Sequence, residues 1–205
     1  MKELKVRITF ISPVLGSQPS DPDIHRTYIA SKAPNAPKIE EEVAAVGVDA
    51  VTKKGMTIFP RDKDGNVVLW DYQIRGFFKA AAQSIHRSKD KDLGPKTLQM
   101  KAFKKIIDQN IFVFGDKLGG RQITIDINGE VGELQRSLRA NTPQGDIVSI
   151  AHSEMINEGS TAEFTIKMLG NDYEDAVKEW LDYGVYNGFG QWRNASYGRF
   201  TWEEI

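Results

Sequence analysis

The chain has no cysteine among its 205 residues, which excludes disulfide bridges and thiolate metal sites. It has no run of 18 apolar residues, so the sequence predicts no membrane-spanning helix. Residues 1–11 alternate charged and apolar side chains and lack the apolar core of a signal peptide. We therefore expect a cytoplasmic protein that does not contact a membrane.

An excess of positive charge is also missing. The chain carries 27 Lys and Arg against 28 Asp and Glu, which gives a formal net charge of −1. Proteins that coat nucleic acid without specificity are usually more basic than this. The balance counts against a broad nucleic-acid-binding surface, but it allows a local groove with the acidic residues placed elsewhere.

The most informative stretch of the sequence is rich in glycine, aromatic residues and arginine, and it covers 184–202. Its members are Gly184, Tyr186, Gly188, Phe189, Gly190, Trp192, Arg193, Tyr197, Gly198 and Arg199. Glycine allows a ligand to approach the main chain, aromatic rings stack on bases, and arginine binds phosphate. The stretch predicts a cradle for a nucleotide or a nucleic acid. It equally fits a glycine-rich turn whose aromatic residues fill the core.

Hydrophobic periodicity predicts a mixed order of strands and helices. Val6, Ile8 and Phe10 alternate with polar residues, as in a strand with one buried face. The expected strands are 2–11, 56–59, 66–72, 111–114, 122–127, 147–155, 162–168 and 197–202, and the longer helices are 74–87, 97–108 and 172–183. Segment 129–145 is polar and is expected to be a mobile arm.

These elements predict an α+β fold with a ferredoxin-like (RRM-like) core and a C-terminal glycine-rich loop. The order strand, helix, hairpin, helix, strand defines such a core. We expect one domain, 1–205, with core segments 2–11, 74–87 and 147–205 and two insertions, 12–72 and 88–146. The hairpin within 147–168 should lie beside the N-terminal strand, and the C-terminal strand should join the same sheet.

The start of the expected helix 74–87 is a second candidate for RNA contact. Arg75, Gly76 and Lys79 would place two cations beside free backbone N–H groups, an arrangement that suits phosphate. A simpler explanation is that Gly76 permits close packing and that the cations are solvated.

Four stretches resemble motifs of the RAMP superfamily of CRISPR-associated RNA-binding proteins, most of all its guide-RNA-binding backbone subunits. In family order they are 8–16 (ITFISPVLG), 72–81 (YQIRGFFKAA), 154–168 (EMINEGSTAEFTIKM) and 188–200 (GFGQWRNASYGRF), which together cover roughly half the chain. In the second stretch 72–75 replaces the family's Pro-Gly-Ser-Ser, and two further departures are the slightly acidic net charge of the chain and the replacement of the family's arginine- and serine-rich loop by 191–196. They are compatible with a diverged or phage-borne member.

The resemblance implies a protein that holds an RNA backbone in a groove. The implied RNA-binding residues are Arg75, Gly76, Lys79, Gly188, Gly190, Trp192, Arg193, Tyr197 and Arg199. The implied partners are guide or other single-stranded RNA, together with copies of this chain or other CRISPR-type subunits. No cofactor and no metal are expected.

Two alternatives remain open at this stage. His25, Tyr28 and Lys32 would share one face of a helix, where they could serve a metal-independent endoribonuclease. The same spacing fits a solvated helix face, which we favour, so the expectation leans away from an enzyme. The second alternative is a phage-encoded counter-defence protein that binds a nucleotide or a protein partner.

Overall fold

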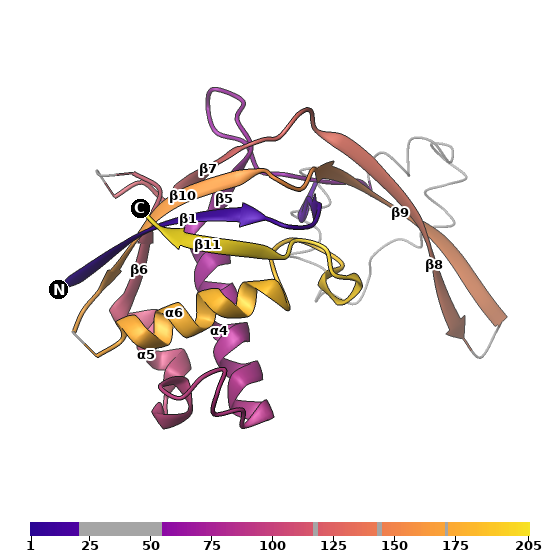
Figure 1. Cartoon of the computed structure of the whole chain (residues 1–205). Coiled ribbons are helices and arrows are strands. Elements are labelled where there is room, and N and C mark those ends of the chain that lie inside the picture. The colour runs from indigo at the N-terminus through magenta and orange to yellow at the C-terminus, as the bar shows by residue number, and fades with distance from the viewer. Residues whose placement is uncertain (21–54, 117–118, 143–144, 171) are drawn as a thin grey trace, which may run out of the picture.

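The computed structural model describes residues 1–20, 55–116, 119–142, 145–170 and 172–205. These residues form a mixed α+β structure with two β-sheets. In Figure 1 the helices lie on one side of the larger sheet, and a long β-hairpin of the smaller sheet extends away from it. Within the described part of the chain, none of the helices has both the length and the hydropathy of a transmembrane span.

The larger sheet has six strands, and every pairing within it is antiparallel. Its strands are β1 (Lys2–Phe10), β5 (Val68–Trp70), β6 (Ile111–Phe114), β7 (Gln122–Asp126), β10 (Thr161–Met168) and β11 (Phe200–Glu204). They follow the order β11-β1-β10-β7-β5, with β6 also beside β10. The segment expected to form the second insertion, 88–146, therefore contributes two strands to this sheet.

The N- and C-terminal strands belong to one sheet, which confirms the expectation from their apolar patterns. β1 pairs with β11 from Val6↔Glu204 to Phe10↔Phe200. On its other side β1 pairs with β10. Alternate β1 residues face the helices and are buried, as period-two alternation predicts.

The expected hairpin within 147–168 is wrong, because its two strands lie in different sheets. β9 (Gly145–Ile156) pairs with β8 (Gly132–Thr142) along their whole length. β2 (Val14–Leu15), β3 (Gln18–Pro19) and β4 (Thr57–Ile58) complete this smaller sheet. The segment expected to be a mobile arm, 129–145, thus supplies the whole of β8.

The turn between β9 and β10 explains why these strands separate. Its backbone bonds to the end of β1 rather than closing a two-stranded hairpin: Gly159 N–H donates to the Phe10 carbonyl, and Phe10 N–H donates to the Ser160 carbonyl. Beyond this point Pro13 interrupts the first strand, since proline has no N–H to donate. β1 then remains with β10, while β2 follows β9 into the smaller sheet.

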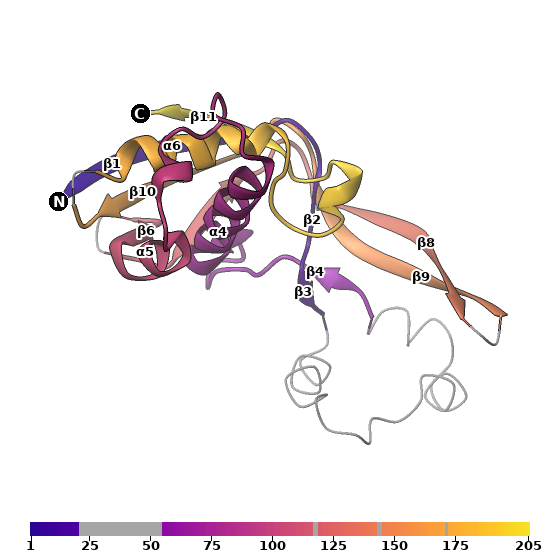
Figure 2. The same ribbon diagram turned by 90° about the horizontal axis from the view of Figure 1, so that it is seen from below.

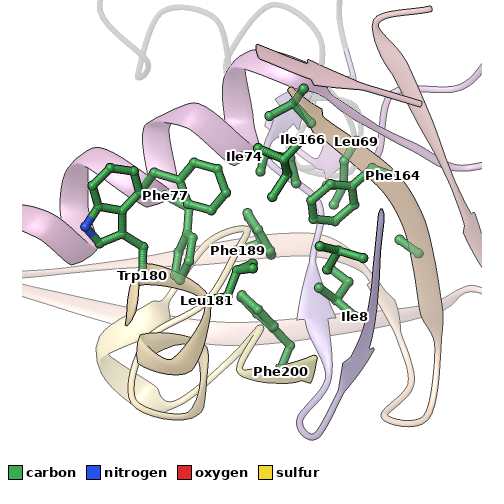
Figure 3. Close-up of a cluster of buried hydrophobic side chains, with 14 of the residues drawn as sticks. Ile8, Leu69, Ile74, Phe77, Phe164, Ile166, Trp180, Leu181, Phe189 and Phe200 are labelled. Atoms are coloured by element: carbon green, nitrogen blue, oxygen red, sulfur yellow. The ribbon is translucent and has the colours of Figure 1, made fainter. Parts of the chain in front are cut away.

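Three helices cover the inner face of the larger sheet: α4 (Asp71–Ser88), α5 (Phe103–Asn110) and α6 (Glu174–Asp182). The buried apolar residues of α4 are Ile74, Phe77, Phe78, Ala81, Ala82 and Ile85. In Figure 3, Phe77 of α4 and Trp180 of α6 belong to the same cluster as Phe164 of β10 and Ile8 of β1. Burial of this apolar surface is the main force that holds helices and sheet together.

Candidate nucleic-acid interface

The glycine-rich stretch is anchored to the core by one aromatic side chain. Phe189 is only 5% exposed. Its ring centroid lies 5.0 Å from that of Phe77 and 5.1 Å from that of Phe200 (Figure 3). Because α4 and β11 both contact this ring, the residues that follow Phe189 start from a fixed position on the core.

The glycines of the stretch bring backbone segments of the chain into direct contact. Phe189 N–H donates to the Gly198 carbonyl at 3.0 Å, and Gly198 N–H donates to the Pro13 carbonyl at 2.8 Å. A Cβ at Gly188 would lie 1.6 Å from the Gly198 oxygen, and one at Gly190 would lie 2.4 Å from the Leu15 oxygen. The interpretation as a tight turn accounts for these glycines. Their contact with RNA stays a prediction.

Between these contacts a short turn presents Trp192 and Arg193 on the surface. Trp192 has a φ of 55° and Ser196 a φ of 68°, a left-handed conformation that costs energy in residues other than glycine. The 3₁₀ turn η3 (Arg193–Ala195) lies between them. Strained backbone of this kind is often retained at binding sites, so it motivates a functional role for the turn.

An arginine from the β8–β9 hairpin completes this surface. The Arg136 guanidinium lies 4.3 Å from the centre of the Trp192 ring, and Trp192 stacks on Tyr197 at 5.1 Å. The Nε and Nη1 atoms of Arg136 are buried, and neither has a hydrogen-bond partner among the described residues. Sequence reasoning placed Arg136 only in a polar arm, because its proximity to Trp192 depends on the pairing of β8 with β9.

These side chains surround a hollow of about 770 Å³, which we call the loop groove. Its lining residues are Arg136, Tyr183, Tyr186, Asn187, Gly190, Gln191, Trp192, Arg193, Asn194 and Ser196. Among the described residues the lining contains two arginines and no acid, although acids outnumber basic residues in the whole chain. In Figure 2 this part of the chain lies beside the base of the β8–β9 hairpin.

The predicted residues of α4 lie inside the helix rather than at its start. The helix begins at Asp71, where the Gln73 side chain accepts the Trp70 N–H at 2.8 Å. Only the first four N–H groups of a helix lack helical partners, so the N–H of Gly76 is not among the free ones. The expectation that Gly76 lies among free N–H groups at the start of the helix is therefore wrong. Arg75 pairs with Asp71 at 3.2 Å.

Three of the nine predicted residues line the loop groove: Gly190, Trp192 and Arg193. Tyr197 is not among the lining residues, but its ring stacks on that of Trp192. Lys79 forms an ion pair with Asp108 at 2.5 Å, away from the groove. The Arg199 main-chain N–H donates to the Ser12 hydroxyl, and its side-chain Nε is buried without a hydrogen-bond partner in the part of the chain that the structure describes. For these outlying residues, contact with RNA stays a prediction.

The proposed nuclease residues His25, Tyr28 and Lys32 lie outside the described residues. Among the residues that are described, no three His, Asp or Glu side chains are grouped as metal ligands would be.

Comparison with known proteins shows that the fold of this chain resembles that of solved structures. No family model matches the sequence, and no curated protein matches it. A chain of the type III-B Cmr-β complex, solved bound to its cognate target RNA, superposes with a TM-score of 0.50 and 11% sequence identity. The match covers all of this chain and 61% of that one. A chain of a type IV-B CRISPR complex matches with a TM-score of 0.48 and 10% identity over 100% of this chain and 90% of that one.

The likeness to the Cmr-β chain establishes a fold shared with a component of a CRISPR complex. At 11% sequence identity the likeness shows a similar fold and nothing more. The function has to be argued from the site.

Proposed function

We propose that this chain is an RNA-binding subunit of the CRISPR RAMP type that holds a single strand of RNA in the loop groove. The observation that carries the proposal is the composition of the groove: Arg136 and Arg193 line it together with the exposed rings of Tyr186 and Trp192, and none of the described residues that line it is acidic. Arginine and aromatic side chains in one groove are the combination that binds single-stranded nucleic acid. A chain of net charge −1 concentrates positive charge here.

The fold supports the same proposal. We interpret β1, α4, β6 with β7, β10, α6 and β11 as a ferredoxin-like core, because the strands follow that order and all their pairings are antiparallel. The Cmr-β chain with a similar fold was solved in a complex with RNA. For the present chain we infer RNA as the ligand and copies of itself or other CRISPR-type subunits as partners.

The open face of the larger sheet is a poorer candidate for RNA than the loop groove. Arg7 contacts Glu163 at 2.7 Å and Glu203 at 2.9 Å. Lys167 contacts Glu3 at 2.8 Å. Two cations on this face, Arg7 and Lys167, are thus neutralised by carboxylates, and the face as a whole carries four acids (Glu3, Asp126, Glu163 and Glu203) against three bases (Lys5, Arg7 and Lys167). Repulsion between these carboxylates and phosphate favours the groove instead.

Substitutions in the groove test the proposal. Arg193→Ala should weaken binding of single-stranded RNA about equally for all sequences, because phosphate contacts position a strand without reading it. Trp192→Ala should also weaken binding, because the Trp192 ring, which stacks on Tyr197, holds the Arg136 guanidinium 4.3 Å from its centre. Filter binding at moderate salt measures both effects.

Arg87→Ala is the matched control, because Arg87 is an exposed arginine at the far end of α4. It should bind RNA as the wild type does. If folded Arg193→Ala and Trp192→Ala also bind like the wild type, the loop groove is not the RNA site and the proposal fails.

A further inference from the structure

A second hollow, which we call the aromatic pocket, adjoins the loop groove. It has a volume of about 670 Å³, and its walls include Pro19, Pro60, Trp70, Tyr72 and Arg121. Gln191 lines this pocket and the loop groove alike. The two hollows therefore meet at one residue, although their other walls come from different parts of the chain.

Two aromatic rings form a flat wall of the aromatic pocket. Trp70 ends β5, and Tyr72 lies in the first turn of α4. Their rings are nearly parallel, with an interplanar angle of 14° and centroids 6.4 Å apart. Tyr72 is 54% exposed, unusually accessible for a residue next to the buried core. A flat aromatic wall that is open to solvent is suited to a planar ligand such as a nucleobase.

Arg121 is held in a fixed position beside this wall. Its Nε donates to Oδ1 of the buried Asp71 at 3.1 Å, and the Asp71 N–H donates to the Arg121 carbonyl at 2.9 Å. The other Asp71 oxygen accepts a bond from Arg75 at 3.2 Å. Among the described residues Asp71 is the only acid that Arg121 contacts, and no hydrogen bond engages its two terminal nitrogens.

The position of the guanidinium suits a phosphate next to the wall. Its carbon lies 6.0 Å from the centre of the Trp70 ring, and the Arg121 side chain is 62% exposed. An arginine oriented through Nε keeps its terminal fork available for two phosphate oxygens. Arg75, which the sequence suggested for RNA contact, would then act indirectly, because it shares Asp71 with Arg121.

We propose that the aromatic pocket binds one unstacked nucleobase of the RNA strand that occupies the loop groove, with Arg121 on an adjoining phosphate. This inference rests on the proposed function of the groove. The shared residue Gln191 lets one strand pass from the groove to the pocket. Stacking on Trp70 and Tyr72 tolerates any base, because every base has a flat π face.

An abasic scan of a bound RNA tests the inference. A labelled single-stranded RNA of one defined sequence is made in versions that each lack one base, and affinities for the full-length protein are measured by fluorescence anisotropy. For the wild type, loss of the base at one position of the RNA should weaken binding, because that base would occupy the aromatic pocket. In Tyr72→Ala the affinity for intact RNA should fall about 5- to 100-fold, and sensitivity at that position should disappear.

Two further variants separate stacking from other roles of the pocket. Tyr72→Phe keeps the ring and should bind like the wild type. Arg121→Ala should weaken binding and reduce its salt dependence, whereas Arg87→Ala should change neither. If Tyr72→Phe is as weak as Tyr72→Ala, the ring does not carry the contact and the stacking proposal is overturned.

The outcomes also distinguish this inference from the proposed function. A wild type that does not bind RNA refutes both. If Trp192→Ala and Arg193→Ala weaken binding while folded Tyr72→Ala and Arg121→Ala do not, the loop groove stands and the pocket proposal fails. Binding of free AMP or UMP that is lost in Tyr72→Ala, with RNA affinity unchanged, would assign the pocket to a free nucleotide and overturn its assignment to a strand.

Discussion

At the scale of single residues, the glycines fall into two groups according to what surrounds them. Gly188 and Gly198 face backbone atoms of the same chain, so a side chain at either position would collide with main chain. Gly76 lies on the exposed side of α4, and a Cβ there would meet nothing within 4 Å. The sequence motif gives no means of telling these groups apart, because both carry the same residue type near aromatic residues.

This difference predicts opposite effects of alanine on stability. Gly76→Ala should raise the free energy of unfolding by ~0.5–1 kcal/mol, because glycine inside a helix is less favourable than alanine. Gly198→Ala should lower it by about 2–4 kcal/mol, since its φ is +74° and its Cβ would lie 1.9 Å from the Phe189 oxygen. Urea unfolding followed by circular dichroism measures both. Destabilisation of similar size in the two variants would contradict the structural assignment.

Only some residues of the candidate site could be predicted from the sequence. Trp192 and Arg193 could be identified because aromatic and arginine residues lie together in a glycine-rich stretch, and both line the loop groove. Arg136 could not be identified in this way. It is 56 residues away from Trp192 in sequence, and only the pairing of β8 with β9 brings it to the ring. The partnership of Arg121 with Asp71 was hidden for the same reason.

At the scale of elements, the sequence predicted strands and helices better than their partners. Alternating apolar residues identified both terminal strands, and helical spacing identified α4 and α6. Strand partners depend on contacts between distant segments, which local periodicity does not encode. The turn after β9 looked like a hairpin turn in sequence, yet its hydrogen bonds go to Phe10. This contact sends β9 and β10 into different sheets.

One ion-pair cluster joins the first strand to α6 and makes a prediction about pH. Glu174 accepts bonds from Lys2 at 2.6 Å and Lys178 at 2.9 Å. The hydrogen bond from Lys2, followed by that from Lys178, lowers the pKa of Glu174 from 4.5 to about 2. Because the folded-state pKa lies below the unfolded one, the stabilisation is present above pH 4.5 and is lost as the pH falls toward 2.

Glu174→Gln should therefore reduce the dependence of stability on pH in this acidic window. Its unfolding free energy should lie below that of the wild type at neutral pH, and the two should converge as the pH approaches 2. Glu130→Gln is the matched control, since Glu130 is exposed and has no ion pair among the described residues. Denaturant unfolding at several pH values measures the difference. Parallel curves for wild type and Glu174→Gln would contradict the assigned role.

At the scale of the whole molecule, charge is distributed unevenly. On the open face of the larger sheet, carboxylates pair with Arg7 and Lys167. Arg136 and Arg193 in the loop groove have no acidic partner among the described residues. Net charge from the sequence allowed a local groove of this kind but could not locate it, because location depends on which carboxylates the fold brings to which cations.

This distribution predicts a modest dependence of RNA binding on salt. If Arg121, Arg136 and Arg193 each neutralise one phosphate, and Arg199 adds a fourth as the sequence suggested, the logarithm of the association constant should fall against the logarithm of salt concentration with a slope of about −2 to −3. Arg193→Ala should reduce the steepness by about 0.7–1, and Arg87→Ala should leave it unchanged. Filter binding across a salt series gives these slopes. A slope as steep as about −7 would require roughly ten phosphate contacts, more than the groove and the pocket can supply, and would indicate a broad binding surface instead.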